Sequence, residues 1–371
     1  MDIIKINDKS HKLYYVGGIV RDELLGFESL DIDLVYEGNA IDFAKNSGLE
    51  ILQINEPFGT VRVLIDGREY DIASTREEIY PKKGHLPQVQ NIAVSLCKDV
   101  KRRDFTINSL YKSLSTGEII DFTGGIEDLK NKKLKVLHKK SFIDDPTRII
   151  RALKFRMRFG FELDDTTRQL QEEYLSNINY DMCYKRVKKE LMDTFNAKNI
   201  PFETLENTFK IFINEGIYKL VTGTLPPVAF CDNLPPASLP LKHQWLIFAG
   251  RLKDLSRLAL TRGEQKILDD LKNLQNSEFK TDLEIYKAFT PCAPETILLY
   301  GILQDKKIIL HYLNNLKDIK LEISGDDLIQ LGLKPSAKFQ EIFDYVLSEK
   351  FKNPKMAKEK ELECAKSFIS Q

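Results

Sequence analysis

The sequence predicts an α+β protein in which a mixed strand-and-helix part precedes a long all-helical part. Short apolar runs punctuated by glycine fill the first 140 residues. From about residue 144 the apolar residues instead recur with the 3.6-residue period of helices. The chain of 371 residues and 42.8 kDa is long enough for two or three domains of roughly 100–200 residues each.

The first part contains four predicted strands and one helix. Residues 12–16 form a strand that runs into Gly17 and Gly18, and residues 19–25 form an amphipathic helix that ends at Gly26. The other strands are expected at residues 32–36, 61–65 and 69–73. Asp66 and Gly67 separate the last two, and this dipeptide between alternating runs predicts a hairpin.

The second part begins with an apolar stripe on one face of a predicted helix. Its members are Ile149, Ile150, Leu153, Phe155 and Phe159. Residues 185–195 continue the helical pattern, and a proline-rich stretch at residues 225–240 predicts a loop or domain boundary. Helices then resume to the end, with interruptions at residues 324–325 and 334–335.

Composition excludes a uniformly charged protein but shows local segregation of charge. Lys+Arg and Asp+Glu both total 55, which excludes a basic nucleic-acid coat and a disordered acidic tail. Residues 1–80 hold 16 acidic and 8 basic side chains, whereas residues 81–195 hold 23 basic and 16 acidic ones. One region can therefore bind a polyanion while another holds a metal ion.

The sequence shows no pattern for export or membrane insertion. It lacks the features of a signal peptide, and no run approaches 18 apolar residues. The five cysteines are dispersed and form no C-x-x-C pair, which argues against a zinc site or a disulfide framework. We therefore expect a cytoplasmic protein without a membrane partner.

Two carboxylates near the start of the second strand form the first chemical pattern. Asp31 and Asp33 are two positions apart, so on a strand their side chains point to the same face. Such a pair suits a cation, and Mg²⁺ takes carboxylate and phosphate oxygens. Gly17 and Gly18 can bring backbone N–H groups close to a triphosphate, and Asp71 can approach the same metal from a later strand.

The order strand, Gly-Gly, helix, strand, Asp-x-Asp predicts phosphoryl or nucleotidyl transfer assisted by metal ions. Taken singly, each part has a simpler interpretation. Most Asp-x-Asp pairs are solvated strand ends, and a lone Gly-Gly is usually a turn. The prediction therefore depends on the combination.

Five short motifs follow one another along the first half of the chain. They are residues 17–34 (GGIVRD, then DIDL), 102–108 (RRDFTIN), 121–129 (DFTGGIEDL), 144–152 (DDPTRIIRA) and 186–191 (RVKKEL). In this order they resemble the motifs of class II tRNA nucleotidyltransferases and bacterial poly(A) polymerases, within the polymerase-β-like superfamily. The resemblance is close over the first half of the chain and loose over the second.

The resemblance implies a polymerase-β-like nucleotidyltransferase head followed by an all-helical neck, body and tail. The head would span residues 1–140, and the neck, residues 141–200, would recognise the nucleotide base. The body (201–320) and the tail (321–371) would bind tRNA, from its acceptor stem to its elbow.

The resemblance also implies a Mg²⁺-dependent enzyme that adds CCA, or part of it, to the tRNA 3′ end from CTP and ATP. Three alternatives stay open. An A-adding enzyme would supply only the terminal A and would need a partner CC-adding enzyme. A poly(A) polymerase shares the head, and a silent RNA-binding module would need no acid pair such as Asp31 and Asp33.

The resemblance assigns roles to individual residues. Asp31 and Asp33 would hold the metal and, with Asp71, form the catalytic carboxylates. The nucleotide-binding residues would be Gly17, Gly18, Arg21, Asp22, Arg103, Asp104, Asn108, Asp145, Arg148, Arg151 and Lys154.

These nucleotide-binding residues divide by the part of the nucleotide they would contact. Gly18, Arg21 and Arg151 would bind the triphosphate, and Arg103 with Asp104 the sugar and its phosphate. Asp145 and Arg148 would select C and A, because a carboxylate accepts from the exocyclic amine while arginine donates to the neighbouring acceptor. Without the resemblance, Asp145 is equally compatible with capping a helix that begins at a proline.

Three features bear on specificity. Asp144 stands where the family usually has Glu, and Lys154 stands where it often has Arg, so the bidentate fork is lost there. Residues 74–87 are rich in Pro and Gly and predict a mobile loop. In the family a loop here is implicated in switching from C to A addition, which argues against CC-only activity; an inert connector is the alternative.

Overall fold

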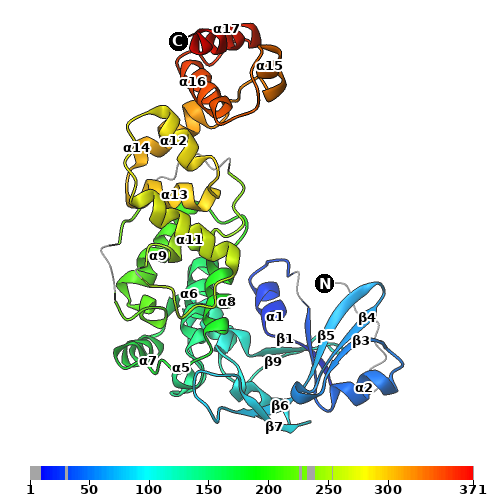
Figure 1. The fold of residues 1–371 in the computed structure, drawn as a ribbon. Helices are drawn as coiled ribbons and strands as arrows, with labels where there is room; N and C mark the ends of the chain where they lie inside the picture. Colours follow the sequence, from blue (N-terminus) through cyan, green and yellow to red (C-terminus); the bar gives the residue numbers. More distant parts are fainter. Residues whose placement is uncertain (1–9, 30–31, 225–227, 232–238, 253, 371) are drawn as a thin grey trace. The chain divides into compact units, whose positions relative to one another are not determined.

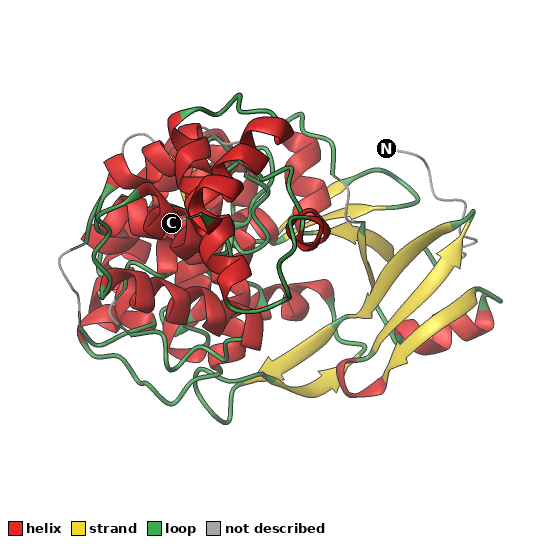
Figure 2. Cartoon of the chain, turned by 45° about the horizontal axis from the view of Figure 1, so that its top comes forward, coloured by secondary structure: helices red, strands yellow, loops and turns green. Residues whose placement is uncertain are grey.

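The computed structural model describes residues 10–29, 32–224, 228–231, 239–252 and 254–370. The chain forms two compact units, one of residues 1–200 with 207–223 and one of residues 201–206 with 224–371. Among the described residues the strands all belong to the first unit, and the second unit is helical (Figure 1, Figure 2). The α+β prediction is confirmed, whereas the boundaries at 140, 200 and 320 stay predictions.

A seven-stranded mixed sheet is the centre of the first unit, with the strand order β3-β4-β5-β2-β1-β8-β9 (Figure 1). Its strands are β1 (Leu13–Val16), β2 (Asp33–Tyr36), β3 (Glu50–Asn55), β4 (Thr60–Ile65), β5 (Arg68–Ser74), β8 (Leu110–Ser113) and β9 (Ile119–Asp121). β2 and β5 run parallel, and the other neighbouring pairs are antiparallel. The four predicted strands and the β4–β5 hairpin are confirmed, and β3, β8 and β9 are additional.

Two short helices pack against this sheet. They are α1 (Gly18–Leu24), which contacts β1 and β8, and α2 (Ala40–Asn46), which contacts β4 and β5. α1 begins directly after Gly17, whose φ of +72° is left-handed and favours glycine. Asn39 caps α2 because its side-chain oxygen accepts from the N–H groups of Ile41 and Asp42.

The segment predicted as a mobile loop contains a hairpin instead. β6 (Arg76–Ile79) and β7 (Gln88–Ile92) pair antiparallel as a separate two-stranded sheet. The connection between them is held at Gly84, whose N–H donates to the carbonyl of Asp144 at 3.0 Å and whose carbonyl accepts from Cys183 at 2.9 Å. A Cβ at Gly84 would lie 2.8 Å from the Cβ of Met182. The loop prediction was wrong because these contacts come from distant parts of the sequence.

The rest of the first unit is mainly helical. Its helices and 3₁₀ turns are η1 (Glu56–Phe58), α3 (Leu96–Asp99), η2 (Val100–Arg102), η3 (Thr106–Asn108), α4 (Gly125–Lys130), α5 (Ser141–Asp144), α6 (Thr147–Phe159), α7 (Asp165–Ser176), α8 (Tyr184–Phe195) and η4 (Ile217–Leu220). β10 (Lys133–Leu134) and β11 (Glu162–Leu163) form a short parallel pair. Four of the five residues of the predicted apolar stripe on α6 are buried, and Phe159 is partly buried. α9 (Phe202–Asn214) is divided between the two units.

The second unit contains the remaining helices. They are α10 (Trp245–Ala249), α11 (Arg262–Gln275), α12 (Asp282–Phe289), α13 (Pro294–Leu303), α14 (Lys306–His311), the π-helical turn η5 (Tyr312–Leu316), α15 (Gly325–Gln330), α16 (Lys338–Lys352) and α17 (Lys358–Ile369). Capping boxes start α11, α12 and α15. Within the predicted loop at 225–240, residues 225–227 and 232–238 lie outside the described residues. None of the described helices is both long and apolar enough to span a membrane.

Candidate active site

Two adjoining hollows in the first unit gather most of the predicted site residues. The first, of about 420 Å³, lies over the sheet and is lined by Asp33 and Asp71 among others. The second, of about 560 Å³, extends to α6 and α8. Asp33 and three arginines line both hollows, so we treat them as one cleft. The predicted residues that line the second hollow are Gly17, Gly18, Arg21, Asp33, Arg103, Asp104, Asn108, Asp145, Arg148, Arg151 and Lys154.

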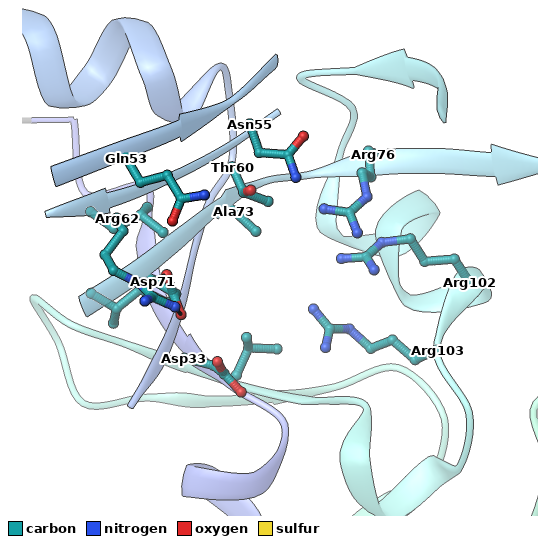
Figure 3. A pocket seen from close by; sticks show the side chains of 13 residues that line it. Asp33, Gln53, Asn55, Thr60, Arg62, Asp71, Ala73, Arg76, Arg102 and Arg103 are labelled. Atoms are coloured by element: carbon teal, nitrogen blue, oxygen red, sulfur yellow. Dashed lines mark hydrogen bonds and ion pairs between the residues drawn. The ribbon is translucent and has the colours of Figure 1, made fainter. Parts of the chain in front are cut away.

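The described catalytic carboxylates are neighbours in the sheet. Asp33 on β2 is in register with Asp71 on the parallel strand β5, and Figure 3 shows both beside the first hollow. Both oxygens of Asp71 accept hydrogen bonds from Arg62, each at 2.9 Å. Asp31 lies outside the described residues. The structure thus brings Asp33 and Asp71 together and holds Asp71 through an arginine that the sequence did not indicate.

The carboxylates of β2 and β5 suit a divalent cation. Within the described part of the chain, no group of three or more His, Cys, Asp or Glu side chains is placed to hold a metal ion. Asp33 and Asp71 nevertheless present an all-oxygen donor set on one hollow, which is the chemistry that Mg²⁺ takes in proteins. The residues therefore fit such an ion.

Arg21 and Asp22 form a buried pair behind the glycine turn. Arg21 donates to Oδ1 of Asp22 at 2.8 and 2.6 Å and to Oδ1 of Asn108 at 2.6 Å. Its guanidinium lies over the rings of Phe155 and Phe159, 5.1 and 4.7 Å from their centroids. Burial lowers the pKa of Arg21 although Asp22 opposes the change. Arg21 is thus firmly held at the cleft wall, and its contact with a triphosphate stays a prediction.

Asp104 is the centre of a second network. Its Oδ1 accepts from a backbone N–H at 2.8 Å and from Asn108 at 3.1 Å, and its Oδ2 accepts from Arg151 at 2.9 and 2.7 Å. Burial raises the pKa of Asp104, but Arg151 and Asn108 outweigh it and lower the pKa to about 2. Arg151 and Lys154 also contact Glu190, at 3.3 and 3.1 Å. The predicted sugar-binding acid and triphosphate-binding arginine are therefore an ion pair.

Asp145 has both of the roles that the sequence left open within reach. One oxygen accepts from the N–H and the hydroxyl of Thr147 at the start of α6, at 3.2 and 2.6 Å, as in helix capping. The other oxygen accepts from Arg186 on α8 and faces the cleft. Arg186 also donates to the carbonyl of His85, in the connection between β6 and β7, at 3.3 Å. The connection is thereby tied to the predicted base-recognising acid.

Arg148 is buried and held from two directions. It donates to the carbonyl of Arg102 at 2.9 Å and to the hydroxyl of Ser141 at 3.2 Å. The hydroxyl of Tyr80, just after β6, accepts from it at 3.4 Å. A fixed guanidinium fork of this kind presents its remaining N–H groups in one direction, which suits recognition of a planar base.

The cleft carries an excess of positive charge. Nine cationic and five acidic side chains line the second hollow. The cations include all of the arginines discussed above except Arg62. Because several of the acids are already paired, an anion with multiple charges, such as a nucleoside triphosphate, would be attracted into this cleft.

Sequence reasoning missed three residues of the site. Arg76 at the start of β6 and Arg102 line both hollows, and Asp99 is buried behind them. Asp99 carried a usable signal, because it precedes Arg102 and Arg103 by three and four residues, the spacing of helical ion pairs. Arg76 carried none, since its segment was interpreted as a loop.

Comparison with known proteins now bears on this geometry. Residues 13–135 match the Poly A polymerase head domain. An A-adding tRNA nucleotidyltransferase of Halalkalibacterium halodurans is 29% identical over 384 residues, which cover 96% of this chain and 89% of that protein. The Thermotoga maritima CCA-adding enzyme, solved with tRNA, superposes with a TM-score of 0.74 at 26% identity, covering 99% of this chain and 94% of the other. The chain belongs to the tRNA nucleotidyltransferase and poly(A) polymerase family.

The length of this nucleotidyltransferase is comparable to that of some relatives and not of others. An A-adding tRNA nucleotidyltransferase of Geobacter sulfurreducens is 28% identical over 417 residues, and the match spans 98% of this chain but 46% of that relative. The predicted family and the polymerase-β-like head with a helical remainder are confirmed. Nucleotidyltransferases of this family use a divalent metal ion, in keeping with the carboxylates on β2 and β5.

The two departures from the family pattern are both engaged in ion pairs in this nucleotidyltransferase. Asp144 accepts from Lys83, in the connection between β6 and β7, at 2.6 Å. Lys154 donates to Glu190 at 3.1 Å, beside Arg151. The shorter Asp144 thus ties that connection to the segment that precedes α6.

Acid should destabilise the first unit through its buried carboxylates. The pKa of Asp104 falls from an unfolded value of 3.8 to about 2 on folding, so its stabilising effect is present above about pH 4 and is lost as the pH falls through 2. The shift corresponds to about 2 kcal/mol. We expect Asp104→Asn to reduce the dependence of unfolding free energy on pH between 4 and 2, measured by urea denaturation. The exposed control Glu50→Gln should keep the wild-type dependence; an unchanged dependence in Asp104→Asn would contradict the assignment.

Proposed function

We propose that this chain transfers nucleotides from CTP and ATP to the 3′ end of tRNA and releases pyrophosphate. The observation that carries the proposal is the cationic cleft, which joins the Asp33 side of the sheet to Asp145 and Arg148 at the start of α6. One end of the cleft suits phosphate and metal, and the other suits a base. The names of the relatives, which include A-adding and CCA-adding enzymes, support tRNA as the acceptor.

In this proposal the 3′ hydroxyl of the RNA attacks the α-phosphate in line, and the bond to the departing pyrophosphate breaks. Asp31, Asp33 and Asp71 would hold Mg²⁺, which, when bound, lowers the pKa of the attacking hydroxyl and neutralises charge on the leaving group. Arg103 and its neighbours bind and orient the triphosphate. The chain's own contribution is thus to align the two reactants and to stabilise negative charge.

Base selection would be carried by Asp145 and Arg148. Cytosine and adenine both present an exocyclic amine next to a ring acceptor, which matches a carboxylate next to a guanidinium. Arg148 is fixed by Arg102, Ser141 and Tyr80, and Asp145 by Arg186. Side chains fixed in this way can act as a template without a nucleic-acid template strand.

An A-adding enzyme is the second candidate. It is favoured by the two relatives that match 96% and 98% of this chain, both of which are named A-adding. In that case a separate CC-adding enzyme must supply the preceding nucleotides. CTP and ATP are the expected substrates of the first candidate, and ATP alone of the second.

The two candidates separate in one assay. Purified chain with Mg²⁺ is given tRNA transcripts that end at the discriminator base, at C or at CC, with CTP, ATP or both. Completion of all three to CCA supports the first candidate, whereas addition of one A to the CC-ended transcript alone supports the second. Long A tracts would indicate a poly(A) polymerase, and no extension would indicate a silent RNA-binding module.

We propose a cytoplasmic location on the same basis. All five cysteines are free in the structure, in keeping with a reducing compartment. We also propose that the tail, residues 321–371, contacts the tRNA elbow. Truncation before residue 321 should then weaken tRNA binding without changing the affinity for ATP.

A further inference from the structure

Asp99, the last residue of α3, is a buried carboxylate that connects three arginines of the cleft. Its Oδ1 accepts from the backbone N–H of Arg76 and from Nε of Arg102, both at 2.9 Å. Its Oδ2 accepts from a terminal nitrogen of Arg103 at 3.0 Å and from the hydroxyl of Tyr111 at 2.9 Å. Asp99 is 0% exposed, and four donors occupy its two oxygens. It therefore cannot touch a substrate itself.

The three arginines, Arg76, Arg102 and Arg103, form what we call the arginine cradle. Figure 3 shows their guanidinium groups pointing into the first hollow, across from the carboxylates of β2 and β5. Glu78 on β6 is the second acid of this group, 2.7 Å from Arg76 and 3.5 Å from Arg102. Two carboxylates thus face three guanidinium groups, which leaves one positive charge in excess toward the hollow.

Asp99 is also the contact that joins separate segments of the cradle. Arg76 begins the β6–β7 hairpin, whereas Arg102 and Arg103 lie at the end of η2. Arg103 is further fixed by Tyr111, whose hydroxyl accepts from its Nε at 3.1 Å and whose ring lies 5.0 Å below the guanidinium. Without Asp99, the two arginine side chains that it binds would lose a common anchor.

We propose that Asp99 is a positioning residue that holds the arginine cradle in the orientation that binds the triphosphate of the incoming nucleotide. The inference rests on the proposed nucleotidyl transfer and names the residue on which its phosphate binding depends. A carboxylate behind a guanidinium fixes its plane, so that the other N–H groups meet phosphate oxygens at little further cost in side-chain entropy.

Asp99 remains charged at every pH at which an enzyme works. Burial raises its pKa, but Arg103 and Arg102, with the hydrogen bond from the Arg76 backbone, outweigh this and lower the pKa to about 2. Asn in its place keeps the shape but removes the charge. Asp99→Asn therefore isolates the electrostatic anchoring from the packing of the side chain.

The test measures phosphate binding apart from catalysis. In the full-length chain with Mg²⁺, calorimetry gives the affinity for inorganic tripolyphosphate and, separately, for adenosine. We expect Asp99→Asn to raise the Kd for tripolyphosphate and the KM for ATP by about 10-fold, and to change the Kd for adenosine by less than about two-fold. The matched control is Glu361→Gln, which removes another fully buried carboxylate, bonded to Lys350 and two backbone N–H groups in the second unit. It should leave both affinities unchanged.

Two results would overturn the inference: a folded Asp99→Asn protein that binds tripolyphosphate as tightly as wild type, or equal weakening for tripolyphosphate and adenosine, which would indicate general distortion. If Asp99→Asn does not fold, Tyr111→Phe decides, since it removes one donor to Asp99 and one acceptor from Arg103. Weaker tripolyphosphate binding, by about three-fold, supports the inference, and unchanged binding contradicts it. Wild-type chain that transfers no nucleotide would instead refute the proposed function.

Discussion

Asp33→Ala should abolish nucleotide transfer while leaving tRNA binding intact. Asp33 lines both hollows and lies beside Asp71 in the sheet, so its loss removes a carboxylate from the point where phosphate and metal would meet. We expect the rate of AMP transfer to fall by about 10³-fold or more. Single-turnover transfer from labelled ATP measures the rate, and filter binding measures the affinity for tRNA. Asp31→Ala should behave in the same way.

The control for this result is Glu50→Ala, which removes an exposed acid at the start of β3 in the same sheet. It should transfer AMP at the wild-type rate. Near-normal turnover in Asp33→Ala would remove this residue from the catalytic site. Loss of tRNA binding together with transfer would instead mean that the substitution disturbs the fold.

Arg148→Ala should abolish the selection of C and A over G and U. The guanidinium of Arg148 is buried and fixed by Arg102, Ser141 and Tyr80, so no neighbouring side chain can replace its fork of donors. We expect discrimination against GTP and UTP to fall by about 100-fold, together with slower AMP transfer. The measurement is kcat/KM for each of the four nucleotides with a CC-ended transcript.

Two variants sharpen this experiment. Arg148→Lys keeps the charge but not the bidentate fork, so selectivity should be largely lost although the site stays cationic. Arg168→Ala removes a partly exposed arginine of α7 that pairs with Glu162, and it should change nothing. Selectivity that is unchanged in Arg148→Ala would eliminate this residue as part of the template.

Much of the first unit could be predicted from local sequence because its strands and its turns carry local signals. The Asp66 and Gly67 turn joins β4 to β5 as expected, and Gly17 adopts the left-handed φ that the start of α1 requires. β3 was missed for a physical reason: it is an edge strand whose residues are mostly exposed, so its pattern shows no buried face. Tertiary pairing with β4 alone defines it.

The site was predictable in its members but not in its pairings. The motifs brought Asp104, Arg148 and Arg151 into the prediction, yet the ion pair of Asp104 with Arg151 joins residues 47 positions apart. Such a contact follows from the packing of α6 against the head and has no periodicity in sequence. The same holds for Arg186 and Asp145, 41 positions apart, because α8 must first dock beside α6.

The central claim is that the cationic cleft of the first unit transfers a nucleotide to the 3′ end of tRNA. The most direct test is incubation of purified chain with Mg²⁺, α-labelled ATP and a tRNA transcript ending in CC. The account predicts one AMP per tRNA with an equal amount of pyrophosphate, and no incorporation by Asp33→Ala. Binding of ATP and tRNA by the wild-type chain without any labelled RNA would contradict it.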